Sequence, residues 1–438
     1  MKITVVGMGK IGLPLAVQFA SKGHTVYGAD VNQRTVELIN AGTEPFPGEV
    51  ELDTRLADVV GRGLLEATLD TTAAVAQSDA VVVVVPLFVD REGVPDFAWM
   101  DNATERIGRG LRTGTLVSYE TTLPVGTTRD RFTPALESFS GLEADRDFHV
   151  VFSPERVLTG RVFEDLRKYP KLVGGITETS TAAGIDFYES VLDFDARPDL
   201  PRPNGVWNLG TSEASELAKL AETTYRDVNI GLANQFARFA DTRGIDVYAV
   251  IEACNSQFFS HIHSPGIAVG GHCIPIYPQM YLWNDPEATI VRAARAANRA
   301  MPQYAVSLLE EKHGSLHGQR VAVLGAAYRG GVKETAFSGV YDVVAALTAA
   351  GATPLVNDPM YTKSEIEALG FADYEFGQTI DAVIIQANHD EYRRVLPEHI
   401  PGARTIIDGR GIASADLRDA IPTYVLGAIA ETSSGVRL

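Results

Sequence analysis

The sequence predicts an α/β protein in which two Rossmann-like, doubly wound domains are joined by a helical central domain with a long connecting helix. Three observations predict this fold class. Short apolar runs alternate with helical patterns at the start of the chain, the same alternation returns near residue 320, and one long helical segment lies between them. Strands that alternate with helices form parallel sheets with right-handed crossovers. We therefore expect domains at residues 1–200, 201–310 and 311–438.

The first domain opens with a strand at Ile3–Val6, a helix at Lys10–Ser21 and a second strand at Thr25–Gly28. Five consecutive valines at Val81–Val85 are typical of a strand that is buried on both faces of a sheet. Two further apolar runs predict strands at Leu116–Ser118 and His149–Phe152.

The central domain is expected to begin with one long helix from about Ser212 to Arg243. This segment is rich in Ala and Leu, holds no proline and meets its first glycine only at Gly231. Thr211 and Ser212 are candidate N-caps, and the helix should end at Gly244. More helix is predicted at Val247–Ala253 and Ala288–Leu309, and Pro198, Pro201 and Pro203 predict a linker before the long helix.

The second Rossmann-like domain repeats the alternation of strand and helix without the whole glycine pattern. A buried strand at Arg320–Gly325 runs into GAAYRGG, which lacks the glycine spacing of a dinucleotide site. We therefore expect this domain to bind something else. A helix at Gly339–Ala350 and strands at Pro354–Asn357, Ala382–Gln386 and Arg404–Asp408 complete the predicted domain.

Composition is that of a globular enzyme and argues against some partners. The 438 residues exceed one ordinary domain, and 45% apolar with 21% charged residues is usual for a soluble protein. The net charge of −18 argues against nucleic acid or an anionic membrane as a partner, because phosphate surfaces need clustered Lys and Arg. With two cysteines and a strand directly at the start, we expect no disulfide framework, no signal peptide, no membrane span and a cytoplasmic location.

A dinucleotide site is predicted where Gly7, Gly9 and Gly12 form GMGKIG between the first strand and the first helix. One glycine makes the turn, the next lets the backbone approach a pyrophosphate, and the third lets the helix pack on the strand. Asp30 closes the second strand, where a carboxylate can bind both ribose hydroxyls and repel a 2′-phosphate. This favours NAD over NADP. Arg34 is a nearby candidate contact, and a solvated helix charge is the simpler interpretation of it.

The loop HSPGIAVGGHCIP, at His263–Pro275, contains the second chemical signal. Cys273 lies among glycines and prolines, and without a Cβ the backbone at Gly270 and Gly271 could approach a substrate closely. A cysteine near a positive group forms a thiolate and attacks carbonyls, but an inert buried cysteine weighs equally on these residues alone. Cys254 lies in a helical pattern and is expected to be structural, and one His beside one Cys is too little for a zinc site.

Several motifs in the right order resemble the UDP-glucose/GDP-mannose dehydrogenase family, particularly its branch that acts on UDP-N-acetyl-hexosamines. The resemblance covers nearly the whole chain and its three-part layout. Besides GMGKIG, the motifs are YETTLPVGTT at 119–128, FSPERVLTG at 152–160, ELAKLAETTYRDVNIGLAN at 216–234 and VGGHCIP at 269–275. The SPERVLTG wording is more similar to the N-acetyl-hexosamine branch than to the glucose branch.

The resemblance implies an NAD-dependent, four-electron oxidation of the sugar's C6 alcohol to a carboxylate, which consumes two NAD. Cys273 would attack the intermediate aldehyde to form a thiohemiacetal, and water would hydrolyse the thioester that follows. Lys219 would stabilise developing oxyanions, and Glu155 would be the acid or base that handles the water. Thr122 would lie near the nicotinamide.

The resemblance also implies binding residues and a partner. Tyr328, Arg329 and Arg410 would hold the nucleotide base and phosphates, although surface arginines beside loops are ordinary. The family implies a homodimer through the long central helix. The remaining residues that its motifs mark are Lys10, Ile11, Pro86 and Thr122 for the cofactor, and Arg156, Val157, Leu158, Lys219, His263, Gly270 and Gly271 for the substrate.

Four positions depart from the family pattern. Thr223, still a catalytic candidate, replaces an Asn one helical turn after Lys219, and Tyr277 replaces an Asp after the Cys-x-Pro. Phe259 replaces an arginine that reaches the neighbouring subunit's site, and AFSG at 336–339 replaces Arg-Glu-Ser-Pro. Loss of one oxyanion donor costs about 3–4 kcal/mol. A tyrosine can donate a hydrogen bond but cannot act as a carboxylate base near neutral pH.

Three functions therefore stay open, ranked in this order. The first is complete oxidation of a UDP-N-acetyl-hexosamine or UDP-glucose type of substrate to a uronate, in polysaccharide or secondary-metabolite biosynthesis. The second keeps the fold and cofactor but stops at the aldehyde or oxidises another nucleotide-bound sugar. The third is an inactive paralogue that binds NAD and nucleotide-sugar, against which the joint presence of Cys273, Lys219, Glu155 and Thr122 argues.

Overall fold

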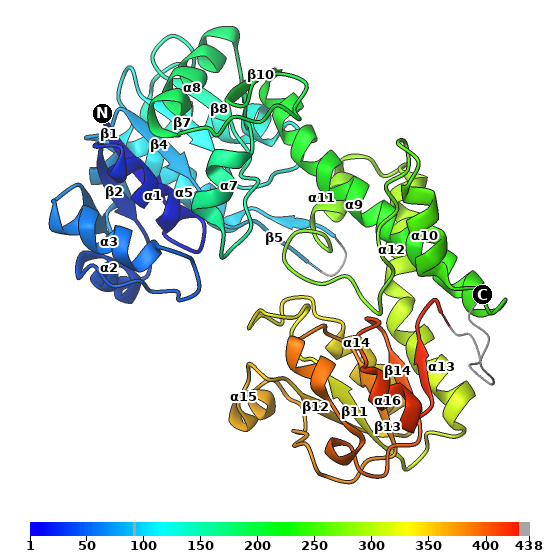
Figure 1. The fold of residues 1–438 in the computed structure, drawn as a ribbon. Helices are drawn as coiled ribbons and strands as arrows, with labels where there is room; N and C mark the ends of the chain where they lie inside the picture. The colour runs from blue at the N-terminus through cyan, green and yellow to red at the C-terminus, as the bar shows by residue number, and fades with distance from the viewer. Residues whose placement is uncertain (91–92, 429–438) are drawn as a thin grey trace. The chain divides into compact units, whose positions relative to one another are not determined.

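The computed structural model of the chain describes residues 1–90 and 93–428, and these form two compact units (Figure 1). The first unit contains residues 1–222 and 279–284, and the second contains residues 223–278 and the chain from Asp285 onward. Residues 429–438, the end of the predicted third domain, lie outside the described residues. Of the helices in the described ranges, none combines the length and the apolar character that crossing a bilayer requires.

An eight-stranded sheet forms the centre of the first unit, in the order β10-β9-β8-β7-β4-β1-β2-β3. Neighbouring strands are parallel except for β8 and β9, which are antiparallel. The strand order reverses at β1, and doubly wound sheets bind ligands at the carboxyl ends of the strands beside such a reversal. The strands are β1 Lys2–Val6, β2 Thr25–Ala29, β3 Leu65–Thr68, β4 Ala80–Val83, β7 Leu116–Tyr119, β8 His149–Phe152, β9 Lys171–Gly175 and β10 Val206–Thr211.

Apolar side chains pack the helices of this unit onto the sheet. Helix α1 buries every residue from Gly12 to Ala20, as expected for a helix that follows a glycine turn directly. The valine run predicted as a strand ends at Val83, and β3, β9 and β10 of this sheet were not predicted at all. The other elements are α2 Gln33–Asn40, α3 Leu52–Gly61, α4 Thr71–Val75, β5 Phe88–Val89, β6 Pro95–Asp96, α5 Ala98–Gly110, η1 Thr128–Phe132, α6 Thr133–Ser140, α7 Val162–Lys168 and α8 Glu178–Val191.

The predicted long helix is α9, which runs from Ser212 to Asp241. Thr211 accepts a hydrogen bond from the backbone N–H of Ala214 at 3.2 Å, so it caps the helix as its sequence position predicted. Gly244, with φ of 64°, follows shortly after the end of the helix. The two compact units meet in sequence within α9, between Glu222 and Thr223.

The helical part of the second unit differs from the prediction in one place. Helix was expected from Ala288 to Leu309, but the structure has two helices that end and begin around Ala300. Pro302 lies in the first turn of the second helix, where a missing N–H costs nothing and the fixed φ suits a helix start. The helices of this unit are α10 Val247–Asn255, α12 Thr289–Arg299 and α13 Met301–His313. Helix α11, Tyr277–Asn284, belongs from Gln279 onward to the first unit.

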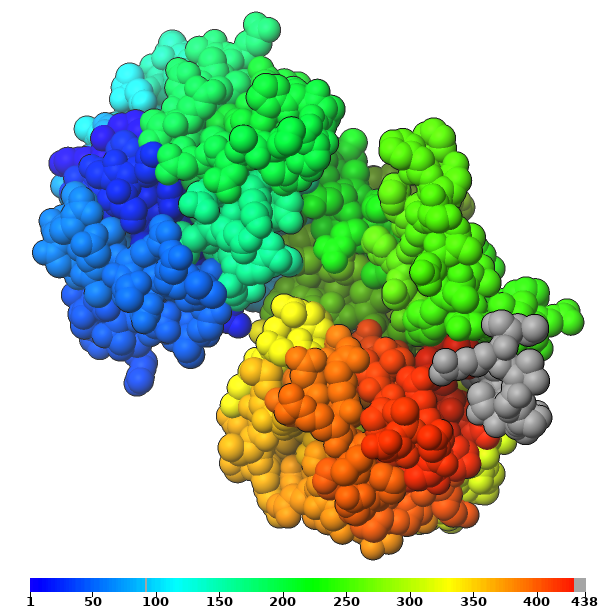
Figure 2. Space-filling view, viewed as in Figure 1, coloured from blue at the N-terminus to red at the C-terminus, as the bar shows by residue number. Residues whose placement is uncertain are grey.

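A five-stranded parallel sheet in the order β12-β11-β13-β14-β15 forms the second Rossmann-like domain. Its residues, yellow to red, make one closely packed body in the space-filling view (Figure 2). Of its strands, only β15 was not predicted. The elements are β11 Arg320–Leu324, α14 Val340–Ala349, β12 Thr353–Asn357, α15 Lys363–Ala368, β13 Ala382–Ile385, η2 Asp390–Arg394, η3 Pro397–His399, β14 Ile406–Asp408, α16 Ala415–Ala420 and β15 Thr423–Val425.

Candidate active site

The three glycines after β1 are needed for three different structural reasons. Gly7 has φ of 94°, in the left-handed region, and its N–H donates to the carbonyl of Ala29 at 2.8 Å. A Cβ at Gly12 would lie 1.9 Å from the carbonyl oxygen of Gly7, so only glycine lets the helix begin so close to the strand. A Cβ at Gly9 would meet nothing within 4 Å. That open space beside a helix N-terminus suits a pyrophosphate.

Asp30, directly after β2, also shapes this loop. Its Oδ2 accepts the backbone N–H of Met8 at 2.8 Å, and its Oδ1 accepts that of Asn32 at 2.8 Å. A carboxylate offers about four acceptor positions, so the same side chain can still bind ribose hydroxyls. Of the other predicted cofactor residues, Lys10, Arg34 and Pro86 are exposed and Ile11 is half-buried.

Two predicted catalytic residues lie together in the first unit. Glu155 follows β8, and the Lys219 ammonium on α9 donates to its backbone carbonyl, with an Nζ–O distance of 2.6 Å. The two residues are 64 positions apart in the chain. Thr122, in the loop after β7, and Thr223, one turn beyond Lys219 on α9, are also buried.

The Glu155 carboxylate is held on both oxygens. Oε1 accepts the backbone N–H of Arg156 at 2.7 Å, and Oε2 accepts from the ammonium of Lys171 at 2.9 Å. Burial acts to raise the pKa of Glu155, but Lys171, the backbone N–H of Arg156 and Glu120 together outweigh it and lower that pKa. Glu155 is therefore ionised near neutral pH.

Sequence reasoning missed the cluster that holds Glu155. Lys171, the first residue of β9, also donates to Oε2 of Glu120 at 2.7 Å, and Tyr188 on α8 donates to Oε1 of Glu120 at 2.6 Å. All three side chains are buried. Burial raises the pKa of Glu120 to about 7, although Lys171 acts to lower it. The one available signal was a lysine opening an apolar run, in KLVGG, which is unusual for a strand buried on both faces.

The three residues after Glu155 make contacts within the first unit. Arg156 Nε donates to Glu222 at 2.8 Å, and the backbone N–H of Leu158 donates to Asp165 at 3.0 Å. The Leu158 side chain is exposed, while Val157 packs against the apolar core. Their role in substrate binding stays a prediction.

The cysteine loop of the second unit is anchored by asparagines of α9. Asn229 donates to the carbonyl of His261 at 2.6 Å and accepts the backbone N–H of His263 at 2.9 Å. Asn234 accepts the backbone N–H of Gly266 at 2.9 Å. Cys273 itself is exposed, which contradicts the interpretation of an inert, buried cysteine.

The glycines before Cys273 make a contact that the sequence did not predict, and their approach to a substrate stays a prediction. A Cβ at Gly270 would lie 2.5 Å from Cβ of Tyr328, and a Cβ at Gly271 would lie 3.1 Å from the Tyr328 ring. The N–H of Gly271 donates to the carbonyl of Ala336 at 2.9 Å. The space left by the missing side chains is thus filled by the second Rossmann-like domain, and the glycines let the loop dock on it.

The predicted nucleotide-binding residues of the second unit lie beside this loop. Arg410 Nε donates to the carbonyl of Gln386 at 2.7 Å, and its guanidinium lies 3.0 Å from where a Cβ on Gly266 would be. Burial lowers the pKa of Arg410. Arg329 is exposed, and its guanidinium lies 5.7 Å from the centre of the Tyr328 ring. Tyr328 and Arg410 therefore both contact the cysteine loop.

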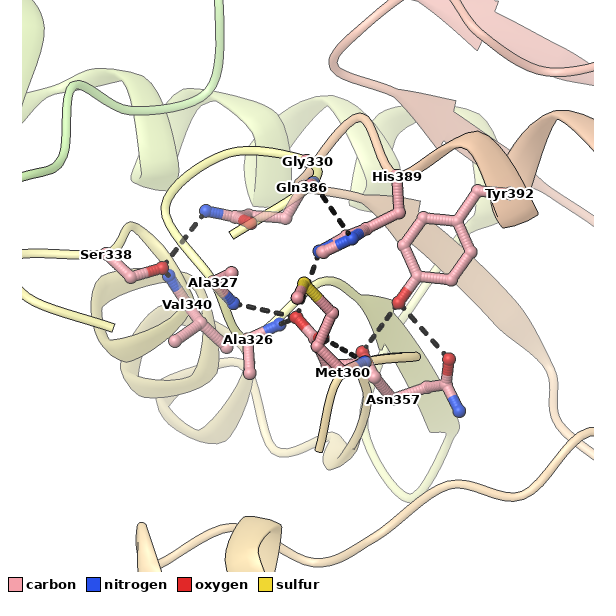
Figure 3. Close-up of polar contacts among 12 residues, drawn as sticks. Ala326, Ala327, Gly330, Ser338, Val340, Asn357, Met360, Gln386, His389 and Tyr392 are labelled. Atoms are coloured by element: carbon pink, nitrogen blue, oxygen red, sulfur yellow. Dashed lines mark hydrogen bonds and ion pairs between the residues drawn. The ribbon is translucent and has the colours of Figure 1, made fainter. Parts of the chain in front are cut away.

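The second Rossmann-like domain closes the position that binds ribose in a dinucleotide domain. Asp358 follows β12 as Asp30 follows β2, but its carboxylate is fully buried. It accepts the backbone N–H groups of Ala326 and Ala327 at 2.9 Å each and lies 3.2 Å from Nε2 of His389 (Figure 3). A carboxylate occupied in this way is not available to a ribose. This agrees with the missing glycine fingerprint in this half of the chain.

Comparisons with known proteins give one consistent family. Three domain models of the UDP-glucose/GDP-mannose dehydrogenase family match the chain: the NAD binding domain at residues 1–192, the central domain at 213–300 and the UDP binding domain at 322–415.

Individual relatives agree with these domain matches. The UDP-N-acetyl-D-mannosamine dehydrogenase of Pyrococcus horikoshii is 34% identical over 94% of this chain and 96% of its own. An NDP-N-acetyl-D-galactosaminuronic acid dehydrogenase of Ralstonia nicotianae is 29% identical over 94% and 96%. The solved structure of the Pyrococcus horikoshii UDP-D-ManNAc dehydrogenase matches with a TM-score of 0.86, 31% identity and coverage of 98% and 100%.

Proposed function

The chain belongs to the UDP-glucose/GDP-mannose dehydrogenase family, and from that premise we propose that it oxidises the C6 alcohol of a UDP-N-acetyl-hexosamine to the uronate. It is an NAD-dependent nucleotide-sugar dehydrogenase. UDP-N-acetylmannosamine is the first substrate to test, because relatives of that name align with nearly the whole chain. The observation that carries the mechanism is the exposed thiol of Cys273 on an anchored loop, in a chain that also pairs Lys219 with Glu155.

The first unit has the residues to hold NAD. Gly7, Gly9 and Gly12 form the loop for the pyrophosphate, with open space at Gly9, and Asp30 is the acceptor for the ribose hydroxyls. When bound, NAD supplies the hydride acceptor for each of the two oxidations. Thr122 lies in the loop after β7, where it would border the nicotinamide.

The protein's own groups would carry the remaining chemistry. The Cys273 thiolate attacks the aldehyde carbon, and the resulting thiohemiacetal is oxidised to a thioester. The Lys219 ammonium stabilises the oxyanion at each tetrahedral stage, with Thr223 as a second, shorter donor. Glu155 takes the proton of the water that attacks the thioester, and the thiolate of Cys273 leaves. Arg156, His263, Tyr328, Arg329 and Arg410 are the proposed contacts to the nucleotide and sugar.

One observation favours a second candidate function, oxidation that stops at the aldehyde. Tyr277 stands where the family has an aspartate, and it begins α11 close to Cys273 in the chain. A tyrosine there cannot supply a carboxylate base. Cys273→Ser separates the two candidates, because complete oxidation requires the thiol and loses acid formation, whereas oxidation to the aldehyde continues.

We propose a homodimer formed through α9. Tyr225, Leu232, Phe236 and Phe239 are exposed by 53%, 44%, 38% and 58%, and their spacing places them along one stripe of the helix. A stripe of large apolar side chains this long suits a second copy of the chain.

We also propose that the chain divides into domains at 1–200, 201–310 and 311–438, as predicted. We further propose a cytoplasmic location, which suits the two free cysteines.

A further inference from the structure

The Glu120, Lys171 and Glu155 cluster, with Tyr188, has a charge imbalance that the mechanism above does not use. Two carboxyl groups share one ammonium, with Lys171 Nζ lying 2.7 Å from Glu120 and 2.9 Å from Glu155. The side chains of Lys171 and Glu120 are 4% and 0% exposed, and that of Glu155 is 11% exposed. If both carboxyl groups were ionised, one buried negative charge would lack compensation, which is costly. The doubly ionised cluster, present above about pH 7, therefore takes up one proton readily.

Burial decides which carboxyl group holds that proton, because the Glu120 side chain is 0% exposed and that of Glu155 is 11% exposed. The Glu155 carboxylate has the backbone N–H of Arg156 and the Lys171 ammonium as donors, and a hydrogen bond from the Glu120 carboxyl also helps to lower its pKa. The two carboxyl groups are thus adjacent as well as bridged by Lys171. Burial pushes the pKa of Glu120 upward and the charge of Lys171 keeps that of Glu155 low, so their proton affinities are separated. Glu155 is thus placed to accept a proton, and Glu120 is placed to receive that proton from Glu155.

We propose that Lys171 and Glu120 are positioning residues for the hydrolysis step, in which Lys171 orients the Glu155 carboxylate and Glu120 receives the proton that Glu155 takes from water. This rests on the proposed role of Glu155. In that step the water oxygen bonds to the thioester carbon and a water proton moves to Glu155. The carbon–sulfur bond breaks, and its electron pair leaves with the sulfur of Cys273. The proton then passes from Glu155 to Glu120, and Glu155 is ionised again.

The groups that face Glu120 come from three elements. Lys171 lies on β9, Tyr188 on α8, and Glu155 in the segment after β8. The Tyr188 hydroxyl donates to Glu120 at 2.6 Å and also contacts Ser118 at 2.7 Å, and the Lys171 ammonium lies 4.8 Å from the Tyr188 ring centre. Because the tyrosine stabilises the ionised form of Glu120, its removal should raise the pKa of Glu120. Replacing Tyr188 therefore changes the pKa of Glu120 in a known direction and leaves the charged groups in place.

The test measures the pH dependence of acid formation from the aldehyde in the full-length enzyme with NAD. In the wild type we expect the rate to rise through an ionisation near pH 7, because the pKa of Glu120 is about 7 and an ionised Glu120 can take the proton. Glu120→Gln should remove that ionisation and lower the rate at pH 8 by about tenfold, less than the 10²–10⁴-fold that a base in direct contact supplies. An unchanged profile and rate would overturn the proposal.

The tyrosine pair supplies the matched comparison if Glu120→Gln folds poorly. Tyr188→Phe should move the ionisation near pH 7 upward, because Glu120 loses its hydroxyl donor. Tyr119→Phe is the control, since Tyr119 is equally buried and its hydroxyl contacts Thr104 at 2.9 Å instead of the cluster. A shift confined to Tyr188→Phe supports the proposal. No shift, or equal shifts in both variants, refutes it.

Lys171 is tested on the Glu120→Gln background. Adding Lys171→Met removes the cation that contacts the Glu155 carboxylate. The ionisation of Glu155 at the acidic end of the pH profile should then move upward by roughly one pH unit or more, as is usual when an opposite charge at short range is lost. An unmoved ionisation contradicts the role of Lys171.

Glu155→Gln separates this inference from the proposed function beneath it. If Glu155→Gln keeps full acid formation, the base assignment itself is wrong. If Glu155→Gln loses acid formation while Glu120→Gln and Tyr188→Phe behave as the wild type, only the present inference is wrong.

Discussion

Two alanine substitutions in one loop should affect two different properties: Gly12→Ala should destabilise the fold, and Gly9→Ala should weaken cofactor binding. A Cβ at Gly12 would lie 1.9 Å from the carbonyl oxygen of Gly7 and 3.0 Å from its carbon, and neither backbone atom can move aside without separating α1 from β1. A Cβ at Gly9 would meet no atom within 4 Å. Gly12→Ala therefore introduces a steric clash in the folded protein itself. Gly9→Ala introduces one only when a ligand occupies the loop.

The magnitudes follow from these distances. Overpacking usually costs about 1–3 kcal/mol, so Gly12→Ala should lower the free energy of unfolding by at least that amount. For a unit of this size, each kcal/mol lowers the Tm by about 2–4 °C. Gly9→Ala should leave unfolding without NAD unchanged and weaken NAD binding by roughly tenfold or more, which is about 1.4 kcal/mol. Saturating NAD should then stabilise Gly9→Ala by correspondingly less than it stabilises the wild type.

The assay is thermal unfolding of the wild type and both variants, each with and without NAD, together with an NAD titration. The Gly9→Ala curve without NAD should overlay the wild type, and the Gly12→Ala curve should not. Wild-type NAD affinity in a folded Gly9→Ala would refute the reasoning, because the pyrophosphate would then not approach the backbone at Gly9. Wild-type stability in Gly12→Ala would refute the packing argument.

Three further predictions concern the second unit. Gly270→Ala should lower acid formation with NAD binding unchanged, because its Cβ would lie 2.5 Å from Tyr328 and push the cysteine loop off its support; equal kinetics in the two proteins would contradict this. Asp358→Asn should lower the free energy of unfolding at pH 7 by about 1–3 kcal/mol, because four donors lose a carboxylate. Burial acts to raise the pKa of Asp358, but His389 and the backbone donors lower it below 3.8. The stabilisation by Asp358 is therefore present above pH 3.8 and is lost as the pH falls through the lowered pKa. A difference in stability between variant and wild type that stays constant down to pH 3 would count against it. Phe236→Glu should convert a dimer to monomers in sedimentation velocity, and a dimer that persists would place the contact elsewhere.

The parts of the fold that local patterns determine could be predicted from the sequence. The glycine spacing, the valine run and the long helix without proline each depend on neighbouring residues, and the structure contains all three. Strand β9 could not be predicted, because it opens with a lysine and ends in two glycines, and β10 is an edge strand without an apolar pattern. Both assignments depend on the order of strands in the sheet, which no local pattern encodes.

The candidate site likewise contains residues that local motifs could reveal and residues that only tertiary contacts bring together. Cys273, Lys219 and Glu155 could be singled out because they lie in motifs, and the contact between Lys219 and Glu155 agrees with their being placed in one site. The cluster of Glu120 and Lys171 could not be found, because the two residues are 51 positions apart. They meet only because β7, which Glu120 follows, and β9, which Lys171 opens, lie on either side of β8. The docking role of Gly270 was also missed, because the sequence does not say which surface a loop will contact.

The most direct test of the central claim is to incubate the enzyme with UDP-N-acetylmannosamine and excess NAD, and to measure NADH formed per sugar together with the mass of the product. We expect two NADH for each sugar consumed and a product with the mass of the carboxylic acid. One NADH per sugar with free aldehyde as the final product would contradict it.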